Sequence, residues 1–150
     1  MKKFYGKYRG TVVNAIDPML QGRVRVEVPG VLGDAGSNWA MPCVPMAAMA
    51  QGMLAIPPVG AHVWVEFERG NADFPIWTGG FWANAAEMPD AGGHRPVWVF
   101  SHDTGFVLKT GHGAMIRVDE MGIFLSNGKG AMVTLVGPEV SINNGALVVV

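Results

Sequence analysis

The sequence predicts an all-β chain made of two structural parts. Its 150 residues include 21 glycines and 10 prolines, which favours many tight turns and short strands over helices. Strict alternation of apolar and polar residues indicates strands in the first part, and a cadence of about eight residues indicates short strands in the second. With 15% charged residues and a formal net charge of −1, the composition argues against a basic nucleic-acid-binding field and against an acidic tail.

Residues 1–90 are predicted to form an OB-fold barrel. Two β-rich runs within residues 8–29 flank a turn at residues 17–22, where Asp17, Pro18 and Gly22 supply the turn chemistry. In residues 23–28 valines alternate with charged residues, as expected for a half-buried strand. The same alternation returns in residues 62–68, and residues 76–82 form a further strand. Several short strands within about 80 residues fit a small closed β architecture.

The long connection between these strands is apolar but is not a predicted membrane span. Pro42, Pro45, Gln51, Pro57 and Pro58 interrupt residues 39–59, where a bilayer helix needs about 20 mostly apolar residues. We expect buried loop and short strand here, with helix only around residues 46–51. Because Cys43 is the single cysteine and lies in this apolar stretch, it is expected to be a small core residue rather than a nucleophile.

Residues 91–104 are predicted to be a linker and residues 105–150 a trimeric β-helical spike. The linker lacks periodicity and is rich in glycine and proline. Six segments of about five residues follow it, each closed by Gly, Asn or an acidic pair. Short strands in one layer cannot bury their apolar side by themselves. An intertwined trimeric β-helix or β-prism would bury that side on a common axis and pair the edges of neighbouring chains.

The predicted trimer core is a stripe of eight apolar residues. Its members are Ile116, Val118, Ile123, Leu125, Val133, Leu135, Val140 and Ile142. Exposed on one chain, such a stripe would promote aggregation. The alternative is that these strands fold back on the first part to make one larger barrel or sandwich, but the abrupt linker and the regular cadence favour the trimer.

The candidate catalytic and metal-binding patterns do not converge on a site. The four histidines, His62, His94, His102 and His112, lack metal-ligand spacing, although three copies of His102 or His112 could meet on a trimer axis. Residues 101–103 (Ser-His-Asp) are adjacent, so along a strand their side chains would alternate between faces rather than converge as in a triad. The carboxylates Glu66, Glu68 and Asp73 are explained by an exposed strand and turn. We therefore predict no catalytic residue, no cofactor, no metal and no enzyme activity.

The aromatic residues support an alternative function. Five tryptophans and the early basic residues could form a stacking platform for single-stranded nucleic acid or oligosaccharide on an OB barrel. Core and subunit interfaces are also rich in tryptophan. Acidic residues on the same barrel and the absence of net positive charge favour this second explanation.

Several residues together resemble a known family. Asp17-Pro18, Gly22-Arg23-Val24, Trp39, Pro58-Val59-Gly60, Val63-x-Val65-x-Phe67, Gly70, Pro75 and Gly79 follow one another over about eighty residues. This pattern resembles the OB domain of the baseplate-assembly V and VgrG family, the central spike proteins of contractile phage tails and related injection systems. Residues 105–150, with "GPEVSIN" near their end, resemble the triple-stranded β-helix that follows this domain in the family.

The resemblance implies a homotrimeric structural spike that attaches below a baseplate hub and pierces the target envelope. The hub-like N-terminal region, the lysozyme domain and the His-x-His iron site of some relatives are not in this sequence, so we expect a separate hub protein at the OB end, no hydrolase and no metal. Leu147, Val148, Val149 and Val150 are expected to form an apolar docking face for a PAAR-type tip protein. Because no apolar run of about seven residues follows the early lysines, we expect synthesis in the cytoplasm without a signal peptide and assembly into the particle.

Overall fold

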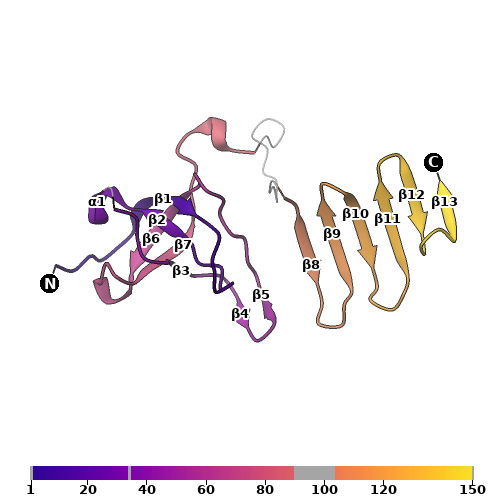
Figure 1. The fold of residues 1–150 in the computed structure, drawn as a ribbon, viewed down its shortest axis with the longest axis horizontal. Helices are drawn as coiled ribbons and strands as arrows, with labels where there is room; N and C mark the ends of the chain where they lie inside the picture. The colour runs from indigo at the N-terminus through magenta and orange to yellow at the C-terminus, as the bar shows by residue number, and fades with distance from the viewer. Residues whose placement is uncertain (1, 34, 90–103, 150) are drawn as a thin grey trace. The chain divides into compact units, whose positions relative to one another are not determined.

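The computed structural model describes residues 2–33, 35–89 and 104–149 and divides the chain into two units (Figure 1). Unit 1 spans Met1–Met88 and unit 2 spans Pro89–Val150. Almost all of the predicted linker, residues 91–103, lies outside the described residues. Within the described part of the chain, no helix is long and apolar enough to cross a membrane.

Unit 1 is built on a five-stranded sheet in the order β2-β1-β6-β7-β3. Its strands are β1 (Tyr8–Asn14), β2 (Arg25–Glu27), β3 (Met41–Pro42), β6 (His62–Phe67) and β7 (Pro75–Gly80). The β1–β2, β1–β6 and β6–β7 pairs are antiparallel, whereas β3 runs parallel to β7. An antiparallel bridge joins Val24, the residue before β2, to Ala40, the residue before β3, and this bridge closes the curled sheet into the predicted OB barrel.

The barrel core comes from the alternation that predicted the strands. Its buried apolar side chains are Val12, Val24, Val26, Val28, Ala40, Val63, Val65, Phe67 and Trp77. On β6 every second residue is buried, because successive strand side chains point to opposite faces of the sheet. The indole of Trp77 donates a 3.1 Å hydrogen bond from Nε1 to the carbonyl of Gly22, which satisfies its one polar group inside the core.

The long connection differs from its prediction in three respects. Residues 46–51 are not helical; they belong to an exposed hairpin of β4 (Ala47–Ala48) and β5 (Gln51–Gly52). The helical pieces lie elsewhere, at α1 (Pro29–Leu32), η1 (Glu68–Gly70) and η2 (Ala85–Glu87). The predicted burial is also wrong, since Met46, Met49 and Cys43 are exposed. Apolar composition there does not reflect the interior of a single chain.

Unit 2 is one antiparallel sheet in which all six strands follow chain order from β8 to β13. The strands are β8 (Phe106–Lys109), β9 (Met115–Asp119), β10 (Gly122–Ser126), β11 (Met132–Val136), β12 (Glu139–Ile142) and β13 (Leu147–Val149). Figure 1 shows them as a flat meander without a second layer. The predicted cadence of short strands is confirmed, and the strands fit one chain's share of a β-prism.

Gly122, the first residue of β10, is closely approached by the neighbouring strand. Its φ is +145°, and a Cβ added there would overlap the carbonyl oxygen of Leu135 on the neighbouring strand. We expect Gly122→Ala to lower the thermal midpoint of unit 2 by several degrees, because both the strain and the clash oppose the β10–β11 pairing. Gly111→Ala is the control, since nothing lies near a Cβ at that position. Equal midpoints by circular dichroism for the two variants would contradict the expectation.

Candidate functional site

The strand register of unit 2 places all eight predicted core residues on one face of the sheet. Ile123 lies opposite Val118 on β9 and Leu135 on β11, and Leu125 lies opposite Ile116 and Val133. The register continues to β12, where Leu135 faces Val140 and Val133 faces Ile142. Residues directly opposite each other on paired strands share a face. The eight residues therefore form one continuous surface, which we call the apolar face.

The register extends the apolar face to four residues that were not predicted as core. Phe106 and Leu108 of β8 lie opposite Val118 and Ile116, and Leu147 and Val149 of β13 lie opposite Ile142 and Val140. The apolar face thus spans all six strands. The sequence marked both end segments as strands, but only the register shows which of their residues share this face.

Much of the apolar face is exposed within its own unit. Ile116, Ile123, Leu125 and Leu135 are each about two-fifths exposed. Among the described residues of unit 2, Ser141 alone is classed as buried, and it lies on the other face, opposite Thr134. Completing the burial of such side chains contributes on the order of 1 kcal/mol each. The sheet is therefore incomplete by itself and needs a covering surface on this face.

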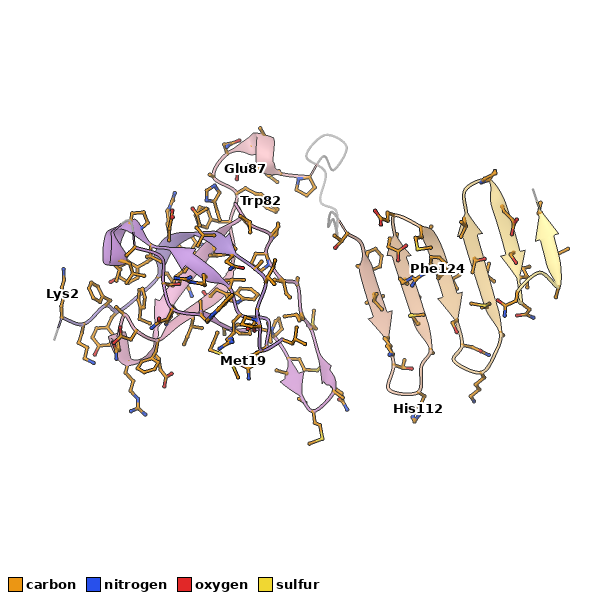
Figure 2. All side chains as sticks on the ribbon, in the orientation of Figure 1. Lys2, Met19, Trp82, Glu87, His112 and Phe124 are labelled. Carbon is orange, nitrogen blue, oxygen red and sulfur yellow. The ribbon has the colours of Figure 1, made fainter. Side chains whose placement is uncertain are left out.

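The opposite face of the sheet is mixed, with charged residues beside apolar ones such as Val107 and Val136. Arg117 Nε lies 3.1 Å from Asp119 Oδ2, and the Arg117 guanidinium lies 3.9 Å above the ring of Phe124 (Figure 2). Thr134, Glu139 and Ser141 also lie on this face. The two-sided character indicates which side would face a partner and which would face water.

The residues predicted for tip docking belong to the last described strand. Leu147 and Val149 lie on the apolar face and are more than half exposed, and Val148 occupies the register position opposite Ser141. Val150 lies outside the described residues. β13 forms one edge of the six-stranded sheet and β8 the other. In the described part of the chain each of these strands pairs on one side, which leaves two edges available to neighbouring chains.

The barrel carries a second organised feature, the Asp17–Arg23 clamp. The Asp17 carboxylate accepts hydrogen bonds from the amides of Met19, Gln21 and Arg23 and a 2.7 Å bond from the Arg23 guanidinium. The hydrogen bond from Arg23 and the three backbone amides hold the pKa of Asp17 well below its usual range despite the desolvation of its carboxyl group. Arg23 also stacks over Trp39 at 5.5 Å. The clamp fixes the loop between β1 and β2.

The aromatic residues of the barrel are largely engaged within the chain. Trp77 is buried, and the guanidinium groups of Arg23 and Arg9 lie over Trp39 and Trp64. Trp82 is exposed beside a groove that is also lined by Pro57, Pro58, His62, Phe81 and Glu87. Of the four tryptophans that the structure describes, one presents an open ring. This arrangement differs from a row of stacking platforms.

The described residues do not bring the candidate histidines and carboxylates together as a metal centre. Across residues 2–33, 35–89 and 104–149, no three His, Cys, Asp or Glu side chains gather as a metal site. Glu66 is paired with Lys7 at 2.9 Å, and His62 lies 3.9 Å from Glu87 in a groove whose described lining contains no Ser, Thr or Cys. His94, His102 and residues 101–103 lie outside the described residues, and His112 lies in the β8–β9 turn.

A closed OB barrel followed by a sheet that lacks its own core defines an oligomeric structural module. Residues 8–82 match the family model of the type VI secretion system/phage-baseplate injector OB domain, and residues 97–148 match that of the phage baseplate V C-terminal trimerisation domain. The chain therefore belongs to the phage baseplate V family. No curated protein shows a significant match to it. The predicted family and fold class are confirmed, and the trimerisation domain supports a homotrimeric structural protein of a phage baseplate or injection system.

Proposed function

We propose that the protein is the central spike of a contractile injection machine, in a phage tail baseplate or a related system. The observation that carries this proposal is the apolar face, which spans six strands and remains open on one chain. Three such sheets turned inward would form a β-prism with a dry axis and a polar exterior. The eight predicted residues, Ile116, Val118, Ile123, Leu125, Val133, Leu135, Val140 and Ile142, would line that axis.

A prism of this kind is suited to bear load. Hydrogen-bonded strand pairs continue through each sheet, and packing of the three apolar faces against one another would join the sheets around the axis. Unfolding one strand would then break contacts in two chains at once and expose the axial side chains to water. Such rigidity is what a protein needs when sheath contraction drives it through an envelope. The domain division that goes with this role is an OB domain at residues 1–90, a linker and a spike at residues 105–150.

The partners follow from the two ends of the proposed spike. The OB end would attach to a separate hub protein of the baseplate. The protein would therefore reside in the assembled particle. The segment of Leu147, Val148, Val149 and Val150 would dock a PAAR-type tip protein, because all four residues are apolar and Leu147 and Val149 are more than half exposed on a single chain.

The proposal is tested on the assembled particle and on the purified chain. Cryo-electron microscopy should place a threefold density of this chain on the tail axis below the hub, and light scattering should give a mass of three 16.0 kDa chains. A density away from the axis would refute the spike role. A monomer that retards oligonucleotides in a gel would instead favour the alternative, an OB module for single-stranded nucleic acid.

Tip docking has its own expected result. Replacing Val148 and Val150 together with Asp should abolish binding of the tip protein while the trimer still forms, because an apolar contact cannot accommodate unpaired carboxylates. Co-purification with the tip protein and light scattering measure the two properties separately. Retained binding by the double variant would refute this docking site.

A further inference from the structure

The barrel exposes a cluster of apolar side chains that neither its core nor the sheet explains. The cluster, which we call the methionine edge, comprises Met19, Leu20, Met46, Met49, Met53 and Leu54, all at least half exposed. Leu20 is 92% exposed and Met49 is 94% exposed. An exposed apolar group of this size on a soluble domain is typical of a contact surface. Methionine, with its flexible thioether chain, is also enriched at protein interfaces.

The methionine edge is one surface although it comes from two segments. Leu54 packs over the loop that holds Met19 and Leu20, since a Cβ added at Gly22 would lie 2.9 Å from Leu54 Cδ1. The amide of Met53 donates a 3.0 Å hydrogen bond to the carbonyl of Met46, across the base of the β4–β5 hairpin. Figure 2 shows Met19 on the side of the barrel from which this hairpin extends. The loop and the hairpin therefore present their apolar side chains together.

The segments of the methionine edge contain residues in strained backbone conformations. Leu20 and Ala50 have φ values of 53° and 55°, a left-handed conformation that non-glycine residues rarely adopt. The Asp17–Arg23 clamp and the hydrogen bond from Trp77 to the Gly22 carbonyl fix the loop from the inside. Strained residues that the surrounding structure holds in place are typical of functional surfaces. A loop that merely connected β1 to β2 would not need to present Leu20 to water.

The chemistry of the methionine edge specifies an apolar partner. None of its six residues is charged, and the nearby Asp17 and Arg23 are turned toward each other. A second copy of the same surface meets this requirement, and the trimerisation domain brings two such copies close. The chain between Met88 and the first strand of the sheet spans at most about 60 Å, so tethering raises the local concentration of the barrels to roughly the millimolar range.

We propose that the methionine edges of three chains converge on the trimer axis and pack against one another, as a second intersubunit contact besides the C-terminal sheets. The inference rests on the trimeric assembly of the proposed function. In threefold symmetry only a surface on the axis can contact its own copies, so the tip of the β4–β5 hairpin, at Met49, is placed there. The contact would hold the three barrels together where the spike meets its hub.

Disulfide trapping tests the convergence directly. With Cys43 replaced by Ser, Met49→Cys should form an interchain disulfide under mild oxidation, because two of three converging cysteines can pair. Glu68→Cys in the same background is the control, an exposed position on the β6–β7 connection that should not cross-link. A trimer in which Met49→Cys links no better than Glu68→Cys would overturn the inference while leaving the trimer intact. A wild-type chain that is monomeric would refute the assembly itself.

Methionine oxidation provides a test without a new cysteine. In the wild-type trimer Met19 and Met49 should react with hydrogen peroxide several-fold more slowly than in a variant whose sheets do not associate, such as Leu135→Asp. Met121, in the exposed β9–β10 turn, is the reference within the same sample. Equal rates at Met49 in the trimer and in the dissociated variant would overturn the convergence and leave the methionine edge to a different protein.

Discussion

Leu135→Asp is expected to convert the trimer into single chains or aggregates. Leu135 lies near the middle of the apolar face, opposite Ile123 on one side and Val140 on the other. In a trimer the substitution would place three carboxylates near one dry axis, and removing each from water costs several kcal/mol. Their mutual repulsion adds to that cost. Sedimentation or light scattering should show loss of the species of three 16.0 kDa chains.

Val136→Asp is the matched control for this change. Val136 is the next residue on the same strand and is 44% exposed, compared with 38% for Leu135, so a single sheet in water would tolerate both substitutions alike. Val136 faces Glu139 on the polar side, where a like charge costs about 0.2–1 kcal/mol. We therefore expect Val136→Asp to remain trimeric. If both variants kept the trimer, or both lost it, the apolar face would not be the trimer core.

The strands were predictable where burial alternates within one chain. Val63, Val65 and Phe67 alternate with exposed or half-buried residues because β6 has one face in the core, and the period of two appears directly in the sequence. The short strands of unit 2 were predictable from their glycine and asparagine turns. The sheet order was not predictable in this way, because the parallel pairing of β3 with β7 and the Val24–Ala40 bridge join distant segments.

Burial was predicted wrongly in the long connection between β2 and β6. Residues 39–59 are as apolar as a core segment, yet Cys43, Met46 and Met49 are exposed on one chain. Composition reports that a side chain avoids water, not which chain covers it. Composition leaves the same question open for the apolar face, namely what covers it. Its residues could still be grouped from the sequence, because they repeat with the strand period of two. The methionine edge lacks such a repeat, and its position emerged only from the packing of Leu54 over Gly22.

The Asp17 carboxylate illustrates a further limit. The sequence marked Asp17 and Gly22 as turn residues and, together with Arg23, as part of the family pattern, but the closure of Arg23 onto Asp17 depends on a folded loop. The two carboxylate oxygens bind three backbone amides and one guanidinium. Local sequence propensities do not predict that these groups come together. Removing one partner of a buried ion pair of this kind strongly destabilises the fold.

Asp17→Asn should therefore destabilise the barrel. The amide nitrogen of the new side chain cannot accept the hydrogen bonds that both Asp17 oxygens now accept, and Arg23 would remain without its counter-ion beside Trp39. We expect the melting temperature of unit 1 to fall by on the order of 10 °C. Tryptophan fluorescence reports mainly this unit, which contains four of the five tryptophans, Trp39, Trp64, Trp77 and Trp82. Glu66→Gln, which breaks the exposed pair with Lys7, should change the melting temperature of unit 1 by no more than about a few degrees.

The effect of Asp17→Asn should also depend on pH with a defined sign. Because the pKa of Asp17 is lowered on folding, its contribution to stability is complete above the ordinary carboxyl pKa of about 4 and declines as the pH falls toward the folded value. Arg23 stays charged throughout this range, and the carboxamide of the variant does not titrate. The difference in melting temperature between wild type and variant should therefore be constant from pH 7 to about 5 and narrow below about 4. A difference unchanged down to pH 3 would show that the Asp17 charge does not hold the loop, and the clamp beneath Met19 and Leu20 would then have to act through shape alone.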